Sequence, residues 1–367
     1  MEVIQEDIRA IAENIVPEAL VLSGKTVLIT GGAGFLGNYF IATIDHLNRT
    51  ALSSPCTVVS ADNFITGVEY WTKPGPNFHP LKHDVKFPIA LDRPVDYLIH
   101  AAGIASPKFY REFKLETIEV ATLGTWNMLK LAKAKGVQSM LSFSSSEIYG
   151  DPDPLFIPTP ESYYGNVSCT GPRANYDESK RLGETLCRTY YETQGVPVKV
   201  VRPFNVYGPG MRSDDYRVIP NFVSKGLRGE PLPVYGDGRN TRTFCYITDA
   251  LTGFFKVLFS DRYGEAFNVG SADTEISMSE LAGIIAELLG GAKVTHTPGL
   301  NDAYANSDPK RRCPDLVKIR SLGFEPQVPL REGLGRFIRW ARDEGAFTLQ
   351  RTGTVASSAA PRAHLSS

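Results

Sequence analysis

The chain has 367 residues, of which 42% are hydrophobic and 22% are charged, and its formal net charge at pH 7 is −1. This length is enough for one large α/β domain or two smaller ones, and the composition is ordinary for a globular protein. A net charge so close to zero excludes a protein-wide field that attracts nucleic acid or a membrane surface. No window approaches the ~18 apolar residues of a membrane span, so we expect neither a nucleic-acid partner nor a membrane association.

The cysteines, the histidines and the N-terminus restrict the compartment and the metal chemistry. The five cysteines are scattered and form no Cys-x-x-Cys pair, which predicts free thiols in a reducing compartment. The start, MEVIQEDIRAIAENIVPEAL, is acidic and amphipathic and lacks the basic residues and long apolar run of a signal peptide, so we expect a cytoplasmic protein. Among the six histidines, His79 and His83 are separated by Pro80, and no metal site is predicted.

Short β-branched runs alternate with amphipathic helical patterns along the first 200 residues. The runs predict strands at 25–30, 57–61, 95–100, 138–143 and 198–202, and the patterns between them predict helices at 34–47, 115–136 and 176–195. Apolar strands that alternate with amphipathic helices indicate a parallel sheet covered by helices on both faces. We therefore predict an α/β fold with a doubly wound parallel sheet of the Rossmann type.

The first predicted strand ends in a glycine-rich turn, TGGAGFLG (30–37). Gly31, Gly34 and Gly37 permit a tight turn, close approach of the backbone to a pyrophosphate and close helix packing, and the following helix N-terminus favours phosphate. Asp62 closes the next strand, where a carboxylate accepts from both ribose hydroxyls and repels a 2′-phosphate. The pattern predicts NAD rather than NADP, the alternatives being a plain turn and a turn aspartate. Further predicted cofactor contacts are Phe35, Leu36, Asn63, Asp84 and Ala101.

Asp84 has two interpretations that the sequence leaves open. It follows "LKH" at the expected end of the third strand, where a carboxylate would lie near the adenine. The same position is equally typical of a residue that caps a loop.

A serine-tipped strand and a Tyr-x-x-x-Lys pair predict the catalytic residues. Tyr176 and Lys180 are four residues apart on a predicted helix, so both face the same side. The lysine charge, together with that of the nicotinamide ring, is expected to bring the tyrosine pKa from ~10 towards neutrality, so that it removes an alcohol proton. Ser145 is expected to hydrogen-bond the same alcohol oxygen, whereas Ser144 and Ser146 are interpreted as structural.

The pattern changes after residue 203 and predicts a second, smaller domain. Glycines, prolines and charges crowd 204–243, and helices return at 248–260, 278–290 and 330–343; Ser277 and Glu280 form a capping box before the second of these. We predict a helical extension at 1–22, an NAD-binding domain at 23–203 plus 241–272, and a smaller α/β substrate-binding domain at 204–240 plus 273–346. The small, polar segment 347–367 is predicted to be a disordered tail.

Between residues 25 and 343 the chain resembles the extended short-chain dehydrogenases/reductases that act on nucleotide sugars. The likeness rests on TGGAGFLG, on Ser145 with Tyr176-x-x-x-Lys180, and on RPFNVYGPG (202–210). Within that family the UDP-glucuronate decarboxylase branch is the most similar, through the segments SSSEIYGDP, GPRANYDESKRLGET, YRVIPNF, GEPLPVYGDG and TRTFCYITD. One departure is Ala121, three residues before Gly124, where the family often has asparagine; it puts the hydrogen bonds behind the site in doubt.

The resemblance implies a substrate, its ligands and an assembly. It implies that Asn205 and Arg242 bind the diphosphate, that Arg217 contacts the nucleotide, and that Arg312 faces the sugar of a UDP-sugar. The guanidinium forks suit carboxylate or phosphate, with a solvated surface arginine as the alternative for each. It also implies a homodimer in which each subunit contributes two helices, here 115–135 and 176–194.

Glu147, at the mouth of the predicted sheet, separates the possible reactions. Related 4,6-dehydratases carry an aspartate–glutamate pair here, but this chain has Ser146 and Glu147, and simple 4-epimerases need neither carboxylate. A lone glutamate matches the decarboxylase branch, in which it would hold the substrate carboxylate or order the water that protonates C5; the alternative is a residue that caps a local turn.

The leading prediction is NAD-dependent, redox-neutral decarboxylation of UDP-glucuronate to UDP-xylose through C4 oxidation, loss of CO2 and re-reduction. The alternatives are a 4-epimerase of a UDP-sugar or UDP-uronate, and a decarboxylase that releases a 4-keto product. An NAD-binding regulator on the same fold would have lost Ser145, Tyr176 or Lys180, and all three are present.

Overall fold

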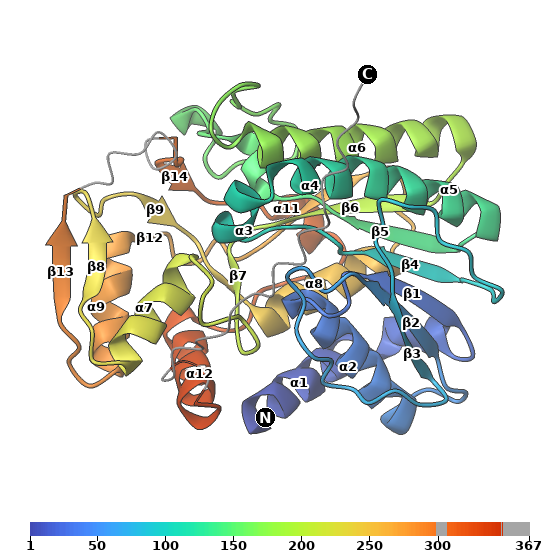
Figure 1. The fold of residues 1–367 in the computed structure, drawn as a ribbon, viewed down its shortest axis with the longest axis horizontal. Helices are drawn as coiled ribbons and strands as arrows, with labels where there is room; N and C mark the ends of the chain where they lie inside the picture. The colour runs from blue at the N-terminus through green and yellow to red at the C-terminus, as the bar shows by residue number, and fades with distance from the viewer. Residues whose placement is uncertain (299–306, 346, 348–367) are drawn as a thin grey trace, which may run out of the picture.

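The computed structural model describes residues 1–298, 307–345 and 347, and a seven-stranded parallel sheet is its centre (Figure 1). The strand order is β11-β6-β5-β4-β1-β2-β3, and every neighbouring pair is parallel. The order runs outward in both directions from β1 and β4, as in a doubly wound sheet. The strands are β1 (Thr26–Thr30), β2 (Thr57–Asp62), β3 (Phe78–Lys82), β4 (Tyr97–His100), β5 (Ser139–Phe143), β6 (Val198–Pro203) and β11 (Ala266–Val269). The predicted fold class is confirmed.

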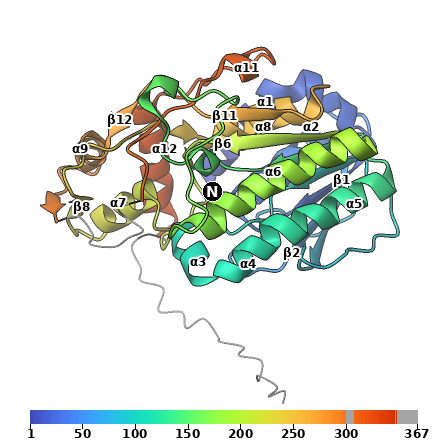
Figure 2. The same ribbon diagram turned by 90° about the horizontal axis from the view of Figure 1, so that it is seen from above.

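Helices cover both faces of the sheet (Figures 1 and 2). One face carries α2 (Phe35–Thr50) and α8 (Ile247–Phe259), and the other carries α4 (Lys114–Glu119), α5 (Thr125–Lys135) and α6 (Ala174–Gln194). All five residues of β1 are buried, because a central strand with helices on both sides has no solvated face.

The structure departs from the predicted elements in three ways. The single helix predicted at 115–136 is interrupted by a π-helical turn, Val120–Gly124, between α4 and α5. Strands β3 and β11, which form the two edges of the sheet, were not among the predicted strands. In β3, Pro80 interrupts the apolar pattern, and an edge strand tolerates the missing N–H. Helices α3 (Pro107–Glu112) and α7 (Val218–Leu227) lie where no helix was predicted, and each has a proline in its first turn, the place where a helix accepts one.

A smaller set of elements lies beside the carboxyl-end edge of the large sheet (Figure 1). It contains the parallel pair β8 (Leu232–Tyr235) and β13 (Val294–Thr297), and the three-stranded sheet β12 (Ile276–Ser277), β9 (Thr241–Arg242) and β14 (Arg311–Arg312). Its helices are α7, α9 (Met278–Leu288) and α12 (Leu330–Asp343), and the predicted capping box at the start of α9 is confirmed. The remaining short elements are β7 (Val206–Tyr207), β10 (Cys245–Tyr246) and α11 (Val317–Arg320).

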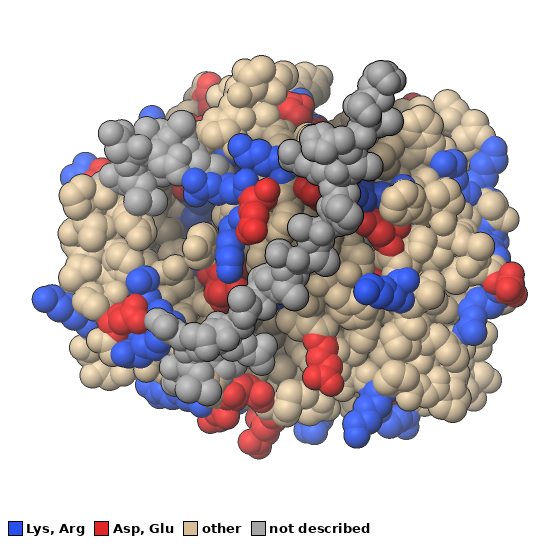
Figure 3. Space-filling model, in the orientation of Figure 1, with Lys and Arg blue, Asp and Glu red and all other residues tan. Residues whose placement is uncertain are grey.

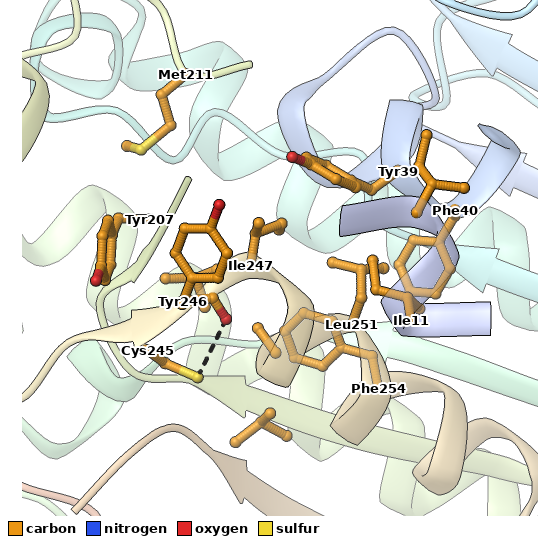
Figure 4. Close-up of a cluster of buried hydrophobic side chains, with 14 of the residues drawn as sticks. Ile11, Tyr39, Phe40, Tyr207, Met211, Cys245, Tyr246, Ile247, Leu251 and Phe254 are labelled. Carbon is orange, nitrogen blue, oxygen red and sulfur yellow. Dashed lines mark hydrogen bonds between the residues drawn. The ribbon is translucent and has the colours of Figure 1, made fainter. Parts of the chain in front are cut away.

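The N-terminal segment forms helix α1 (Glu2–Ala19) and a 3₁₀ turn, Leu20–Leu22, and packs on α8, α2 and α12. Ile11 of α1 lies against the apolar side chains of α2 and α8, including Phe40 and Leu251 (Figure 4). The same helix carries Asp7, a carboxylate in this core. Helix α1 therefore joins elements from both parts of the molecule.

The distribution of charged side chains and the state of the cysteines agree with the expectations from the sequence. Basic and acidic side chains are interspersed on the face shown in Figure 3, in keeping with the net charge of −1. All five cysteines lie within the described residues and are free thiols. Within the described part of the chain, no helix combines the length and the apolar character that crossing a membrane requires. Of the predicted tail, residues 348–367 lie outside the described residues.

Candidate active site

The carboxyl ends of the central strands open into a cleft. Gly31 and Gly34 line it from the turn after β1, Asp62 and Asn63 from the end of β2, and Ala101 from the segment after β4. The strand order reverses between β1 and β4. Ligands of doubly wound sheets bind at this edge and at this reversal point. Five of the predicted cofactor residues therefore lie together where a dinucleotide would bind.

The glycine-rich turn is shaped for close approach. Gly31 has φ +74°, and a Cβ atom there would lie 2.6 Å from the backbone nitrogen of Ala102. A Cβ atom on Gly37 would collide with the carbonyl oxygen of Gly31. Phe35 and Leu36 form the first turn of α2, whose free N–H groups face the cleft end of the turn. The two glycines are therefore required by the backbone, and the turn leaves room for a phosphate.

Asp62 is buried at the end of β2 and retains free acceptor capacity. One carboxylate oxygen accepts from the backbone N–H of Ala33 at 3.0 Å, and the other accepts from that of Phe64 at 2.8 Å. A carboxylate has about four acceptor sites, so two remain for ribose hydroxyls. Burial raises the pKa of Asp62, and the backbone donors oppose the rise. These contacts fit the predicted ribose role, and the bond from Ala33 ties Asp62 to the glycine-rich turn.

Asp84 lies between two residues that line the cleft, His83 and Val85. One carboxylate oxygen accepts from the backbone N–H of Lys86 at 3.0 Å. This contact is typical of a residue that caps a loop, and the adenine role stays a prediction.

The three predicted catalytic groups meet at the ends of β5 and α6. The hydroxyl of Ser145 lies near enough to the phenol of Tyr176 to lower its pKa, and it accepts from the backbone N–H of Glu147 at 3.2 Å. Lys180 donates from Nζ to the carbonyl oxygen of Phe143 at 2.7 Å, and its Nζ lies 5.9 Å from the centroid of the Tyr176 ring. Tyr176 and Lys180 share a face of α6, as the four-residue spacing predicts.

Burial controls the protonation of this pair. It raises the pKa of Tyr176 to about 12, although the bond to Ser145 lowers it. Burial also lowers the pKa of Lys180 to about 8. The expected fall of the tyrosine pKa included the charge of a nicotinamide ring, and the groups of the chain alone produce a shift in the other direction. Lys180 keeps its positive charge at neutral pH because its pKa remains above 7.

Glu147 does not cap a local turn, so that interpretation is wrong. Its carboxylate accepts two bonds from Arg312 of β14, each 2.7 Å long, and a third from Arg173 at the start of α6. Burial alone raises the pKa of Glu147, but Arg312 and Arg173 outweigh it and bring the pKa to about 2. The local turn is capped instead by the Ser145 hydroxyl. Glu147 is thus a half-buried carboxylate ion held beside Ser145.

A second set of ion pairs surrounds this one. Arg173 also lies 3.5 Å from Asp177 through Nε and 3.5 Å from Asp308 through a terminal nitrogen. Asp308 accepts from Arg242 of β9 at 2.6 Å. We call the six residues the arginine–carboxylate network: Glu147, Arg173, Asp177, Arg242, Asp308 and Arg312. The network brings together two of the predicted substrate residues, Arg242 and Arg312, both buried.

The other two predicted substrate residues flank the network. Arg217 pairs with Asp215 through two nitrogens at 3.0 and 2.5 Å, and its charge acts on the phenol of Tyr176. Asn205 has φ +42° and donates its amide to the carbonyl oxygen of Thr243 at 2.7 Å.

The hydrogen bonds behind the site are made without the family asparagine. The carbonyl oxygen of Ala121, in the π-helical turn, accepts from the hydroxyl of Thr125 at 2.7 Å. That hydroxyl lies 3.2 Å from Nε2 of His100, whose Nδ1 lies 2.7 Å from the hydroxyl of Thr30. Burial and the charge of Lys180 lower the pKa of His100 to about 3, so the ring is neutral. Thr125 and His100 thus make the hydrogen bonds at this place, where Ala121 has no side-chain donor.

Sequence reasoning quoted Arg173 and Asp177 within a motif but gave them no role, and it did not consider Asp308. A signal was present, because Arg173, Tyr176, Asp177 and Lys180 are spaced three, four and seven residues apart on one helix face. Asp308 had no such signal, because its partners are brought to it only by the fold.

Comparison with known proteins agrees with this site. The model of the NAD dependent epimerase/dehydratase family matches residues 27–270. The chain belongs to this family. UDP-glucuronic acid decarboxylase 2 of Arabidopsis thaliana is 40% identical over 349 residues, which are 93% of this chain and 74% of that protein. UDP-glucuronic acid decarboxylase 1 of Xenopus tropicalis is 40% identical over 326 residues, which are 87% of this chain and 73% of that protein.

Solved structures of the family share the fold. Epimerase Mth375 of Methanothermobacter thermautotrophicus matches with a TM-score of 0.77 and 30% identity, over 91% of this chain and 97% of that one. The dTDP-glucose 4,6-dehydratase DesIV of Streptomyces venezuelae, solved with NAD, matches with a TM-score of 0.75 and 28% identity, over 87% of this chain and 97% of that one. The family depends on NAD, and the glycine turn and Asp62 of this chain fit that cofactor.

Proposed function

We propose that this chain converts UDP-glucuronate to UDP-xylose by oxidation at C4, loss of CO2 and re-reduction, with NAD as a cofactor that is regenerated in each turnover. The observation that carries the proposal is the half-buried Glu147, held by Arg312 and Arg173 beside Ser145 and Tyr176. The similarity to UDP-glucuronic acid decarboxylases over most of the chain supports the same substrate.

The first task of the site is to take a proton from the C4 hydroxyl. Tyr176 is the base, and Ser145 holds the same hydroxyl oxygen in line with it. Lys180 is positively charged at neutral pH and stabilises the phenolate, to which its ammonium is close. The glycine turn and Asp62 would hold NAD, which would supply the acceptor for the C4 hydride and the hydride donor for the final reduction.

The second task is to break the C5–C6 bond. A ketone at C4 is β to the C6 carboxylate, so the bonding pair moves towards the C4 oxygen when CO2 leaves. Ser145 and Tyr176 donate to that oxygen as negative charge develops on it. Glu147 holds both terminal nitrogens of Arg312, so Arg312 meets the C6 carboxylate through Nε, which no acceptor among the described residues reaches. Glu147 orients that carboxylate through Arg312 or orders the water that protonates C5. Arg242 and Asn205 bind the diphosphate, and Arg217 the nucleotide end.

Proton NMR of the product tests the proposal. The protein is incubated with UDP-glucuronate and NAD, and CO2 is measured in the same reaction. We expect UDP-xylose and one CO2 per substrate, with no net NADH. A 4-keto pentose with accumulated NADH would indicate a decarboxylase that releases its intermediate. UDP-galacturonate without CO2 would overturn the proposal in favour of a 4-epimerase.

We propose that the enzyme works as a homodimer through α4, α5 and α6. Exposed apolar side chains gather on these helices: Leu115 is 71% exposed, Leu123 47%, Trp126 47% and Leu182 48%. Light scattering at micromolar concentration is expected to give twice the mass of the chain, 40.3 kDa. Trp126→Glu, which puts a charge in the patch, is expected to give a monomer; a monomeric wild-type protein would contradict the proposal.

The division of labour in the chain is also proposed. Residues 23–203 plus 241–272 bind NAD, and residues 204–240 plus 273–346 bind the nucleotide sugar, with 1–22 as an extension. In support, the cleft is lined by residues of the first part. Strand β9, at the start of 241–272, lies in the smaller set of elements and pairs with β12 and β14, which places Arg242 and Arg312 side by side. The free thiols are in keeping with a reducing compartment, and we propose a cytoplasmic location.

A further inference from the structure

Without a substrate, the arginine–carboxylate network holds equal numbers of guanidinium and carboxyl groups among the described residues, so its charges balance when all three carboxyl groups are ionised. Within the described chain it contains three guanidinium groups, on Arg173, Arg242 and Arg312, and three carboxyl groups, on Glu147, Asp177 and Asp308. A ligand that brings a further negative charge changes this balance. A UDP-uronate adds one carboxylate, and a UDP-glucose adds none.

Asp177 is the least satisfied carboxyl group of the network. Its residue is 4% exposed, and no donor among the described residues reaches its Oδ1. Its Oδ2 lies 3.5 Å from Nε of Arg173, which is too long for a strong charge-assisted bond. Glu147 and Asp308, by contrast, each accept short bonds from an arginine, at 2.7 and 2.6 Å.

The charged groups that face Asp177 come from three elements. Arg173 lies on its own helix, Glu147 on the 3₁₀ turn after β5, and Arg312 on β14. Burial, with the charge of Glu147, raises the pKa of Asp177 to about 7, and Arg173 and Arg312 oppose the rise. Asp177 is therefore partly protonated at neutral pH, whereas Glu147 stays ionised. An added carboxylate beside Arg312 weakens the opposing effect and favours the protonated form.

We propose that Asp177 takes up a proton when the uronate carboxylate enters the network and holds it until CO2 leaves. This inference rests on the proposed function. Asp177 acts through Arg173 and Glu147 and is a positioning residue, not one that contacts the sugar. Its role is to keep the network, most of whose groups are buried, neutral with the substrate bound.

The stoichiometry of decarboxylation agrees with this role. When the C5–C6 bond breaks, CO2 carries no proton away, and C5 gains one, so each turnover consumes one proton. The loss of CO2 also removes the extra negative charge from the network, and Asp177 then returns to its former, lower proton affinity. The proton is therefore bound when the carboxylate arrives and released when C5 requires it.

Calorimetry tests the uptake directly. The Tyr176→Phe variant is used with NAD because its turnover is expected to be very slow. It is titrated at pH 8 with UDP-glucuronate and with UDP-glucose, in buffers of different ionisation enthalpy. For a pKa that rises by one to two units from about 7, uronate binding takes up about 0.4 to 0.8 proton more than UDP-glucose binding. Equal proton uptake with the two ligands refutes the proposal. This comparison needs no substitution of Asp177.

Asp177→Asn in the same background distinguishes proton holding from a structural role. In the Tyr176→Phe protein that keeps Asp177, we expect the ratio of the Kd for UDP-glucuronate to the Kd for UDP-glucose to rise about 5- to 25-fold from pH 7 to pH 9, because uronate binding is linked to proton uptake. Asparagine is a neutral analogue of the protonated Asp177, so in Asp177→Asn this ratio is expected to stay constant from pH 7 to pH 9. Uronate binding at pH 9 is expected to be no weaker than in the protein that keeps Asp177. Weaker uronate binding at every pH with the slope retained would show that Asp177 is only structural.

The two proposals fail separately. If the wild-type protein releases no CO2 from UDP-glucuronate, the proposed function is wrong. If it releases CO2 and forms UDP-xylose but uronate binding takes up no extra proton, only the role of Asp177 is wrong.

Discussion

Glu147→Gln removes one charge from the most tightly held carboxylate of the site and keeps its size. The pKa of Glu147 lies at about 2 against an ordinary value of 4.5, despite burial, because Arg312 and Arg173 bind the ionised form. A difference of this size corresponds to about 3 kcal/mol, at 1.36 kcal/mol for each pKa unit. Since the folded pKa is lowered, this stability is present above pH 4.5 and is lost as the pH falls through 2 to 4. At pH 7 we expect the glutamine variant to be less stable by about 3 kcal/mol.

The assay has a stability arm and a catalytic arm. Urea unfolding at pH 7 measures the first, with Glu325→Gln as the matched control. Glu325 also accepts two bonds from one arginine, Arg320, both 2.8 Å long, but this pair is exposed and is worth at most about 1 kcal/mol. Release of CO2 from UDP-glucuronate measures the second arm and is expected to fall about 100-fold or more in Glu147→Gln, and not in the control.

Two results would refute this reasoning. If Glu147→Gln is as stable as Glu325→Gln, the charge of Glu147 does not hold the two arginines. If Glu147→Gln makes CO2 at the wild-type rate, the carboxylate has no part in the reaction, whatever its stability. Oxidation of UDP-glucose, where it occurs, should change much less, because that sugar has no carboxylate to position.

Three further outcomes are expected. Asp62→Ala should weaken NAD and narrow its advantage over NADP in calorimetry; equal affinities of the wild-type protein for both would remove the ribose role. Tyr176→Phe should lose about 100- to 10,000-fold in C4 oxidation while UDP-glucuronate still binds, and near-normal turnover would mean that another group is the base. Asp7 accepts from the buried hydroxyls of Tyr39 and Tyr246, and burial raises its pKa to about 7 from 3.8. A raised carboxyl pKa costs stability as the pH rises from 4 to 7, so urea unfolding should show Asp7→Asn gaining about 2 to 3 kcal/mol relative to wild type between pH 5 and pH 8. A constant gap would contradict this.

The features that sequence reasoning recovered are local in the chain. The glycine turn, Asp62 and the Tyr176–Lys180 pair each depend on a strand, a turn or one face of a helix, whose geometry is set by residues a few positions apart. The sequence also showed Glu147 as a carboxylate in an unusual place. It left open whether Asp84 caps a loop, and it missed β3 because Pro80 interrupts the pattern of an edge strand.

Only the tertiary structure decided which charges meet. Arg312 is 165 residues from Glu147, and Tyr246 is 239 residues from Asp7, so no spacing in the sequence relates them. Burial then changes what these groups do: the same kind of carboxyl has a pKa of about 2 in Glu147 and about 7 in Asp177. The sequence by itself determined the fold class and the catalytic residue types, because they are encoded in short-range patterns. The protonation state of each acid was decided by the fold, because desolvation and the distance to a guanidinium exist only once distant segments have packed together.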